Sequence, residues 1–118
     1  MAIHSELLQQ LLNSRCKEIG AKEKGLIIPS IESNLSHLSG WQTPLNYAEI
    51  HKRFDFKNYY QTVAFVNAVT WLAHREDHHP RICFGYNWCE IHLSTHSIKG
   101  LSLNDMIMAA KINALLAD

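Results

Sequence analysis

Residues 74–80, with the sequence HREDHHP, are the stretch of the chain best suited to chemistry. Histidine titrates near neutral pH and also binds metals, so the run offers acid–base groups or metal ligands. Consecutive histidines leave the chain in different directions, and Pro80 stiffens the segment, which lowers the entropy cost of holding a site in place. The simpler interpretation is a charged, solvated end of a helix, and the run alone does not separate these interpretations.

General acid–base catalysis requires further groups that converge on the same pocket, one to donate a proton and one to accept it. His78 or His79 would face His96 if the segment after the long helix lies beside the end of the last strand. Asp77 and Asp105 are candidates to orient the imidazoles and to set their tautomers. The spacing therefore identifies candidate residues but does not prove that they converge.

A metal site and a nucleophilic cysteine are the alternative chemistries. The sequence contains neither HExxH nor CxxC, the spacings typical of zinc ligands. Cys83 and Cys89 fall in predicted strands with apolar neighbours, where a cysteine is most often a buried structural residue. The candidate metal ligands would be His74, Asp77, His78, His79, His92 and His96.

Hydrophobic periodicity predicts the elements that must position these side chains. Residues 57–76 are expected to form the central helix, with Tyr59, Val63, Val66 and Ala73 on its apolar face. Residues 89–95 are the clearest half-buried strand, because apolar and polar residues alternate there. Further helices are expected over residues 3–20, 29–40 and after Ser102, and further strands over residues 41–44, 48–56 and 82–87.

Capping residues indicate where these helices begin and end. Ser30 is the candidate N-cap of the second helix, and glycines 20 and 40 are expected to end the first and the second. Pro80 disfavours helical conformation at His79 and so ends the central helix. Ser102, with Asp105 three positions later, predicts a capping box at the start of the last helix.

The chain length and the order of the elements predict the fold class. A chain of 118 residues with 47% hydrophobic residues corresponds to one domain with its own core. The strands come in pairs, which indicates antiparallel hairpins, and the helices must cover one face of the resulting sheet. The expected architecture is therefore α+β, with a four-stranded antiparallel sheet and helices packed on one face.

Composition limits the cellular setting and the partners. Eleven Lys and Arg balance eleven Asp and Glu, which gives no electrostatic case for nucleic acid or for an anionic membrane. Three cysteines without a disulfide-framework spacing are expected to be reduced thiols. No long apolar run predicts a membrane span, and the first residues lack the features of a signal peptide. The expected location is the cytoplasm.

Taken together, the motifs resemble the signature of the pterin-4a-carbinolamine dehydratase family. That pattern has an acid, base or histidine, then three residues and His-His-Pro, then an aromatic residue, Ile-x-Leu-Ser-Thr-His, Gly-Leu-Ser and an aspartate. The residues that match are His74, His78-His79-Pro80, Tyr86, residues 91–96 (IHLSTH), residues 100–102 (GLS) and Asp105.

The resemblance covers roughly residues 38–116, because residues 40–41 (GW) and 53–77 are also similar to the family's first strand pair and central helix. The implied organisation is an N-terminal helical extension over residues 1–37 and a family-like domain over residues 38–118. His74 departs from the pattern, since many members carry glutamate there, and this puts substrate affinity in more doubt than the reaction type.

The resemblance implies a dehydratase that converts 4a-hydroxytetrahydrobiopterin to the quinonoid dihydropterin and water, without a metal or an organic cofactor. It implies His78, His79 and His96 as the catalytic group, with His78 and His96 as the proton-transfer residues and His79 closer to the ring. The implied substrate-binding residues are His74, Asp77, Pro80 and Asp105. The family fold is likewise a four-stranded antiparallel sheet with helices on one face.

The resemblance also implies partners. Members form homodimers or homotetramers, and their substrate arises when an aromatic amino-acid hydroxylase uses its tetrahydropterin. The alternative function is a non-catalytic protein-interaction module, because animal members also serve as a dimerisation cofactor for a transcription factor. An interaction module alone has no need for the three histidines together with Pro80 and Asp105.

Overall fold

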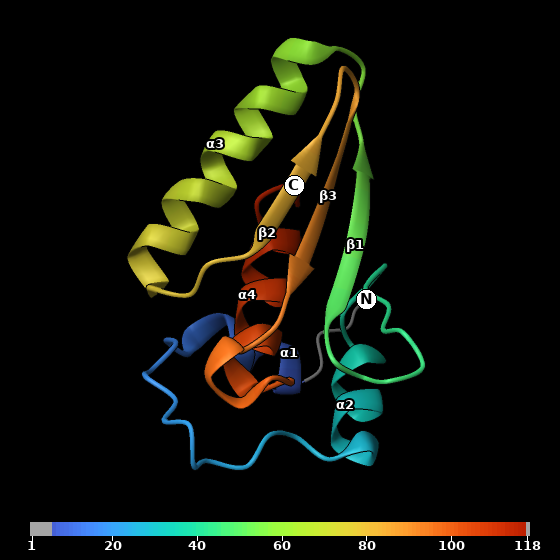
Figure 1. Ribbon diagram of the computed structural model, residues 1–118. Coiled ribbons are helices and arrows are strands. Elements are labelled where there is room, and N and C mark those ends of the chain that lie inside the picture. Colours follow the sequence, from blue (N-terminus) through green and yellow to red (C-terminus); the bar gives the residue numbers. More distant parts are fainter. Residues whose placement is uncertain (1–5, 118) are drawn as a thin grey trace.

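A three-stranded antiparallel sheet with the strand order β1-β3-β2 is the platform of the fold (Figure 1). The computed structural model describes residues 6–117, so residues 1–5 of the expected N-terminal extension lie outside the described part. In chain order the elements are α1 (Glu6–Asn13), α2 (Ile28–Leu35), β1 (Ile50–Asp55), α3 (Tyr59–Glu76), β2 (Arg81–Phe84), β3 (Trp88–Leu93), the 3-10 helix η1 (His96–Ile98) and α4 (Leu103–Ala114).

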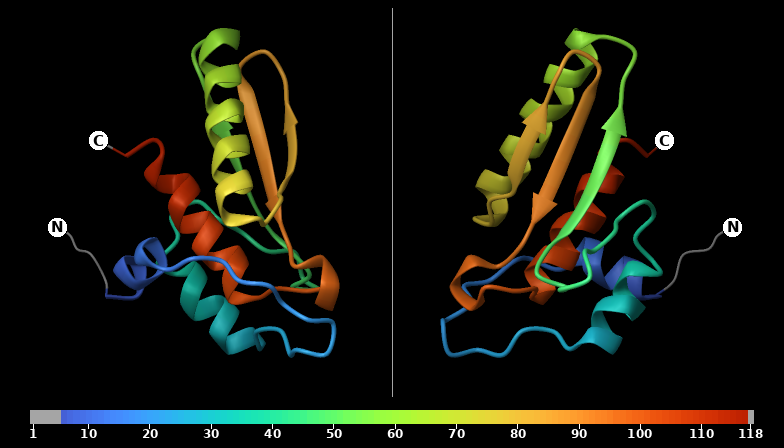
Figure 2. Two further views of the ribbon diagram at one scale, coloured as in Figure 1. Left: turned by 90° about the vertical axis from the view of Figure 1, so that its left-hand side faces the viewer. Right: turned by 45° about the vertical axis from the view of Figure 1, so that its right-hand side comes forward.

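Strand β3 lies between the other two strands and confirms the predicted alternation. Cys89, Ile91 and Leu93 are fully buried, whereas Glu90 and His92 are partly exposed on the opposite face. Helices α3 and α4 lie on the same side of the sheet (Figure 2). The buried residues of β3 therefore pack against these helices and leave the other face of the sheet open.

The predicted α+β class agrees with the structure, but the predicted fourth strand, over residues 41–44, is wrong. Gln42 exchanges two backbone hydrogen bonds of 2.9 Å with His51, and this is an isolated bridge. Pro44 follows, and proline has no N–H with which to extend a ladder. The chain instead turns, with Tyr47 N–H donating to the Pro44 carbonyl and Tyr47 in the left-handed region at φ 53°.

The central helix α3 has 18 residues, as its periodicity predicts, but its buried face differs from the predicted one. Val63 and Val66 are only partly buried, and Tyr59 is exposed and stacks on Tyr86. The residues that face the core are Thr62, Phe65, Val69, Leu72, Ala73 and Glu76. Of the predicted face only Ala73 is buried, because the core-facing stripe through Phe65 and Val69 lies beside the stripe that holds Val63 and Val66.

Helix α3 ends earlier than Pro80 requires. Its last residue is Glu76, and Asp77 follows in the left-handed conformation at φ 52°. The N–H of His78 donates to the Ala73 carbonyl, which satisfies one of the last carbonyls of the helix. The reversal at Asp77, and not the proline, therefore sets the direction in which the histidines leave α3.

The N-terminal helices are shorter than predicted. Helix α1 ends at Asn13 instead of near Gly20, and the hydroxyl of Ser14 donates to the Gln10 carbonyl at this end. Helix α2 begins at Ile28, so Ser30 lies inside the helix and is not its N-cap. Leu11 of α1 and Ile31 of α2 are both buried in the same core as the sheet. None of the helices within residues 6–117 has the length and apolar character needed to cross a bilayer.

A buried carboxylate, Glu76, joins three segments where α3 ends. Its Oε2 accepts a hydrogen bond of 2.9 Å from Lys111 and forms an ion pair with Arg15 Nε at 2.9 Å, and its Oε1 accepts a hydrogen bond of 2.8 Å from the Cys16 N–H. Burial alone would raise the pKa of Glu76. The bonds from Lys111 and Cys16, with the charges of Lys111 and Arg15, outweigh burial and hold the pKa below its ordinary value.

Replacement of Glu76 by glutamine is expected to destabilise the fold by about 3 kcal/mol at pH 7, because Lys111 loses its buried partner. A carboxylate whose folded pKa is depressed stabilises the fold above its unfolded pKa of about 4.3. That stabilisation is lost as the pH falls through the folded value. The gap in unfolding free energy between wild type and Glu76→Gln, from urea titrations, should therefore narrow below about pH 4.

The matched control is Asp55→Asn, because Asp55 is exposed and, among residues 6–117, its only ion pair is with the exposed Arg53. This variant should change the unfolding free energy by less than about 0.5 kcal/mol. A Glu76→Gln gap that stays constant from pH 7 to pH 3 would show that the carboxylate charge contributes nothing.

Candidate active site

A histidine–aspartate pair joins the segment after α3 to the first turn of α4. His78 Nε2 lies 2.7 Å from Asp105 Oδ1, with 11% of the His78 side chain exposed and the Asp105 side chain fully buried. A carboxylate accepts hydrogen bonds, so Nε2 carries the proton of this bond. The tautomer is thereby set, and within residues 6–117 His78 Nδ1 has no hydrogen-bond partner.

Asp105 is itself held in place on its other oxygen. Its Oδ2 accepts hydrogen bonds from the Thr95 hydroxyl at 2.7 Å and from the Ser102 N–H at 3.0 Å. The Ser102 hydroxyl completes the chain by donating to Thr95 Oγ1 at 2.6 Å and accepting from the Asn104 N–H. These bonds confirm the predicted capping box of Ser102 and Asp105. Asp105, whose carboxylate completes the capping box of α4, therefore also orients His78.

His96 is brought to the same place by the loop between β3 and α4. The Thr95 N–H donates to the Gly100 carbonyl at 2.7 Å, which closes the loop around η1, and Lys99 reverses the chain at φ 52°. His96 is the first residue of η1, and its side chain is exposed. The loop thus presents His96 beside the buried Thr95, which bonds Asp105.

A polar cavity of about 470 Å³ connects these residues. His78, His96 and Asp77 line it, together with Thr95, Ser97, Glu76 and Asn104. The segment after α1 also lines the cavity, with Cys16, Lys17, Glu18 and Ile19. The cavity is large enough for a small bicyclic ligand and contains one tautomer-fixed imidazole and one exposed imidazole.

The remaining predicted site residues lie around a different hollow. His79 is 70% exposed and reaches toward Asp77, with 3.8 Å between Nε2 and Oδ1. His74 and Pro80 line the same hollow of about 310 Å³ as His79, with Ile82 at its side. His74 also packs against the exposed Trp71 ring. The structure thus groups His78, His96, Asp77 and Asp105, and places His74, His79 and Pro80 apart from them.

Sequence reasoning missed Thr95, Glu76, Asn104 and residues 16–19 as parts of this site. Thr95 lies within the family-like IHLSTH motif and could have been found there as the hydroxyl residue next to His96. The other residues gave no signal, because their contacts join positions that are 60 to 88 residues apart.

Cys16 lines the cavity but is poorly suited to act as a nucleophile. Burial, followed by the negative charge of Glu76 and a hydrogen bond to it, raises the pKa of the Cys16 thiol to about 12. Its Sγ donates to the Asn104 carbonyl at 3.6 Å. Because the thiolate is the reactive form, this cysteine is a structural wall residue.

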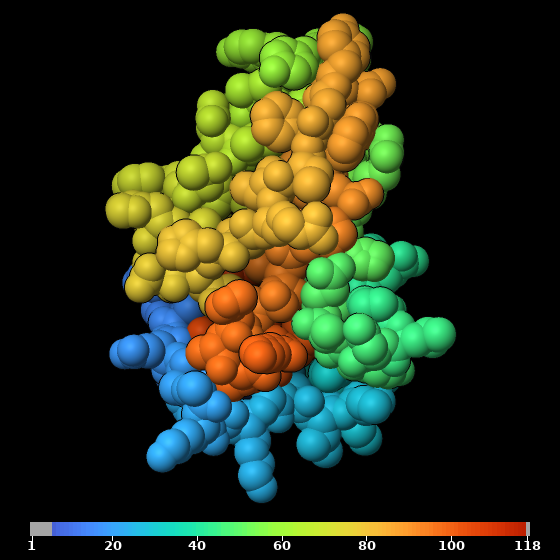
Figure 3. All heavy atoms as spheres, in the orientation of Figure 1, coloured from blue at the N-terminus to red at the C-terminus, as the bar shows by residue number. Residues whose placement is uncertain are grey.

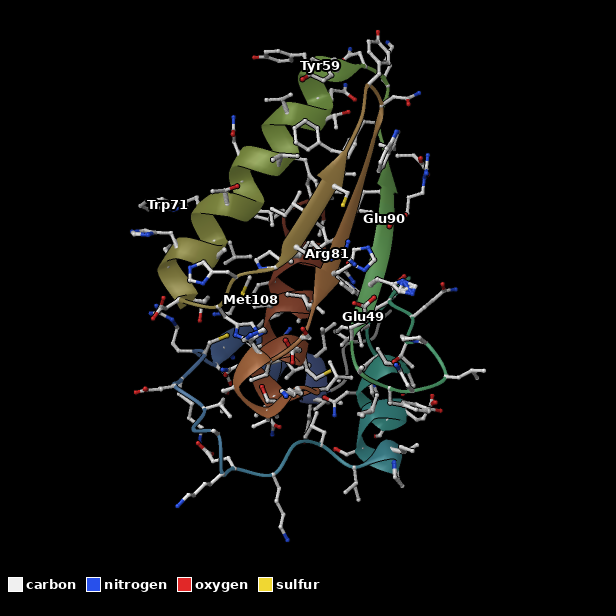
Figure 4. The ribbon with its side chains drawn as sticks, in the orientation of Figure 1. Glu49, Tyr59, Trp71, Arg81, Glu90 and Met108 are labelled. Atoms are coloured by element: carbon white, nitrogen blue, oxygen red, sulfur yellow. The ribbon has the colours of Figure 1, made fainter. Side chains whose placement is uncertain are left out.

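A second histidine cluster lies on the open face of the sheet and is separate from the cavity. His92 Nδ1 is 2.9 Å from Glu49, its Nε2 is 2.8 Å from Glu90, and its ring stacks on His51. The hydrogen bond from His92 holds the pKa of Glu90 below its ordinary value. Figure 4 shows Glu49, which directly precedes β1, and Glu90 of β3 near Arg81. Within residues 6–117, no three His, Cys, Asp or Glu side chains are grouped so that they could hold a metal ion.

An α+β fold with an aspartate-held histidine at a polar cavity is typical of enzymes that use side chains for proton transfer. The chain belongs to the pterin 4 alpha carbinolamine dehydratase family, whose model matches residues 26–115. A relative from Hydrogenovibrio crunogenus, provisionally named a pterin-4-alpha-carbinolamine dehydratase, is 62% identical over 106 residues, which cover 90% of this chain and 94% of the relative. A protein of the same name from Nitrosospira multiformis is 48% identical over 110 residues, covering 92% and 94%.

Two solved structures resemble this chain in fold and in sequence. One is a transcriptional coactivator/pterin dehydratase from Brucella melitensis, with a TM-score of 0.75 and 32% identity over 78% of this chain and 98% of that one. The other is a pterin dehydratase-like protein described as a RuBisCO assembly factor in the alpha-carboxysome, with a TM-score of 0.59 and 30% identity over 67% of this chain and 92% of that one. The fold therefore occurs in proteins described by a dehydratase name and in one described by an assembly role.

Proposed function

We propose that this protein dehydrates a 4a-hydroxytetrahydropterin to the quinonoid dihydropterin by histidine acid–base catalysis. The observation that carries the proposal is the His78–Asp105 pair at a cavity that His96 also lines. Family membership supports the reaction class, because the family model and the curated relatives carry the dehydratase name.

The reaction requires two proton movements and no redox partner. The C4a–O bond breaks, and its electron pair leaves with the oxygen as water once the hydroxyl is protonated. The proton on N5 is lost, and its electron pair forms the C4a=N5 double bond, so atoms and charge balance. A protonated imidazole serves the first step and a neutral imidazole serves the second.

His78 and His96 are the proposed proton-transfer residues. His78 has a fixed tautomer with a free Nδ1, whereas the side chain of His96 is exposed to solvent. His79 is proposed to bind the pterin ring, with His74 and Pro80 beside it, so that the substrate extends from the cavity toward their hollow. Asp77 lines the cavity at the turn between these two groups.

The direct test follows the decay of freshly generated 4a-hydroxytetrahydropterin by stopped-flow absorbance. Wild-type protein is expected to accelerate the decay by about 10²-fold or more over buffer, since each well-placed acid or base contributes 10²–10⁴-fold. Addition of a chelator should leave the rate unchanged. A decay rate equal to that in buffer would refute the proposed activity.

The physiological setting follows from the substrate. A 4a-hydroxytetrahydropterin is left behind when an aromatic amino-acid hydroxylase uses its tetrahydropterin, so we propose that the protein returns this pterin to the cycle. Co-incubation with such a hydroxylase should raise the recovery of quinonoid dihydropterin during turnover. No increase in recovery would remove the proposed link.

A non-catalytic interaction role is the second candidate, supported by the solved relative described as an assembly factor. Tyr60 and Trp71 on α3 are 83% and 62% exposed, so neither packs in this chain's core, and Trp71 projects away from the sheet (Figure 4). Exposed aromatic residues of this kind suit contacts between subunits. We propose a homodimer or homotetramer, for which sedimentation equilibrium gives the subunit number.

A further inference from the structure

The segment Arg15–Ile19, here called the strap, is anchored to the end of α3. The Cys16 N–H donates to Glu76 Oε1 at 2.8 Å. The Arg15 side chain donates to the Arg75 carbonyl at 3.0 Å and pairs with Glu76 Oε2 at 2.9 Å. Because Glu76 is buried, this end of the strap has a fixed position relative to α3.

Two further anchors connect the strap to the other walls of the cavity. The amide of Asn104 pairs with the backbone of Lys17, accepting from its N–H at 3.1 Å and donating to its carbonyl at 2.6 Å. The hydroxyl of Ser97 donates to the Ile19 carbonyl at 2.7 Å. The strap is therefore held along its length and is not a loose tail.

Each anchor lies next to a residue of the proposed acid–base group. Glu76 is two positions before His78, Asn104 immediately precedes Asp105, and Ser97 immediately follows His96. The space-filling view shows the strap in blue against the orange residues of the η1 loop, below the yellow end of α3 (Figure 3). The three anchors of the strap therefore lie within two residues, in sequence, of His78, Asp105 and His96.

The strap supplies a carboxylate that no other group in the described part of the chain uses. Of the acidic residues that line the cavity or bond its histidine, Glu76 and Asp105 already accept hydrogen bonds on both oxygens. Asp77 is 93% exposed and lies near His79. Glu18 lines the cavity, and within residues 6–117 its side chain has neither a hydrogen bond nor an ion pair.

A pterin offers a matching group for such a carboxylate. The pyrimidine edge of its 2-amino-4-oxo ring carries two parallel donors, the exocyclic amino group and N3–H. Two parallel N–H donors fit the two oxygens of a carboxylate, as they do in a bidentate guanidinium pair. The edge lies at the end of the ring system remote from C4a, so a residue that holds it leaves the reacting atoms free.

We propose that the strap is a wall of the substrate pocket and that Glu18 binds the 2-amino-pyrimidine edge of the pterin. This inference rests on the proposed function and adds a substrate-binding residue to it. The family model begins at residue 26, so the strap lies outside the residues it matches. The residue that would select 2-amino pteridines thus lies outside the region that the family model matches.

The test compares wild type with Glu18→Gln, which keeps the size of the side chain and removes its charge. KM for the 4a-hydroxytetrahydropterin is expected to rise about 10-fold, and kcat to stay within about twofold, because the bond is remote from the reacting atoms. The dissociation constant of a 7,8-dihydropterin, measured by fluorescence, should rise by the same factor. The corresponding 7,8-dihydrolumazine has oxygen in place of the 2-amino group and should bind both proteins equally weakly.

The matched control is Glu6→Gln, which removes the same charge from an exposed position on α1 that does not line this cavity. It should leave KM and the dissociation constant unchanged. Equal KM and equal dissociation constants for wild type and Glu18→Gln would overturn the inference. If wild type binds the dihydropterin through Glu18 but does not accelerate the dehydration, the proposed function fails and this inference stands. If wild type binds no dihydropterin, both fail.

Discussion

Replacement of His78 by glutamine is expected to lower kcat for dehydration by about 10²- to 10⁴-fold, the range for loss of a positioned acid or base. Glutamine retains an N–H that reaches Asp105, so the buried carboxylate keeps a donor while the titratable ring is lost. The measurement is stopped-flow decay of the 4a-hydroxytetrahydropterin at saturating substrate. Circular dichroism and a urea titration confirm that the variant is folded.

Two further variants sharpen this result. His96→Ala should lower kcat by a similar order, because the proposed mechanism gives His96 a proton transfer, whereas its exposed ring contributes little to the fold. His37→Gln is the matched control, since His37 is an exposed histidine in the turn that follows α2 and does not line the cavity. If His78→Gln keeps more than half of the wild-type kcat, His78 is not a proton-transfer residue.

Replacement of Asp105 by alanine is expected to destabilise the fold by about 3–5 kcal/mol, the cost of removing one partner from a buried charged network. The loss is large because one fully buried carboxylate accepts bonds from His78, Thr95 and the Ser102 N–H. The substitution also removes half of the capping box of α4. Urea unfolding followed by circular dichroism measures the change.

Asp105→Asn separates the two roles of this residue. The amide keeps the volume and one acceptor oxygen, so the stability loss should be about half that of the alanine variant, whereas the His78 tautomer is no longer fixed. A fall in kcat comparable to that of His78→Gln is therefore expected while the protein remains folded. An alanine variant with the urea midpoint of wild type would show that the network does not stabilise the fold.

Local sequence signals predicted the parts of this fold that depend on near neighbours. The alternation in residues 89–93 and the pair Ser102 and Asp105 are local, and both predictions are confirmed. The fourth strand failed because strand formation depends on a partner, and Gln42 meets β1 at a single residue pair before Pro44. Hydrophobic periodicity does not show whether a segment has a partner strand along its length.

The site was predictable in its residue types but not in its arrangement. The motif identified His78, His96 and Asp105, which the structure groups. It did not show that His79, one residue along, lies at another hollow, because that depends on the left-handed turn at Asp77. The strap could not be predicted from the sequence, because its anchors join residues distant in the chain through single polar contacts.

Asp105 both completes the capping box of α4 and holds His78, and this has a consequence for how such proteins evolve. A descendant that abandoned the chemistry and kept only the shape would still need an acid here to start its last helix and to satisfy Thr95. Retention of the aspartate is therefore no mark of an active enzyme, contrary to the expectation from the sequence that an interaction module has no need of it. The imidazole that the aspartate holds has no comparable role in starting the helix, so under the proposed function loss of His78, and not of Asp105, would mark a relative without dehydratase activity.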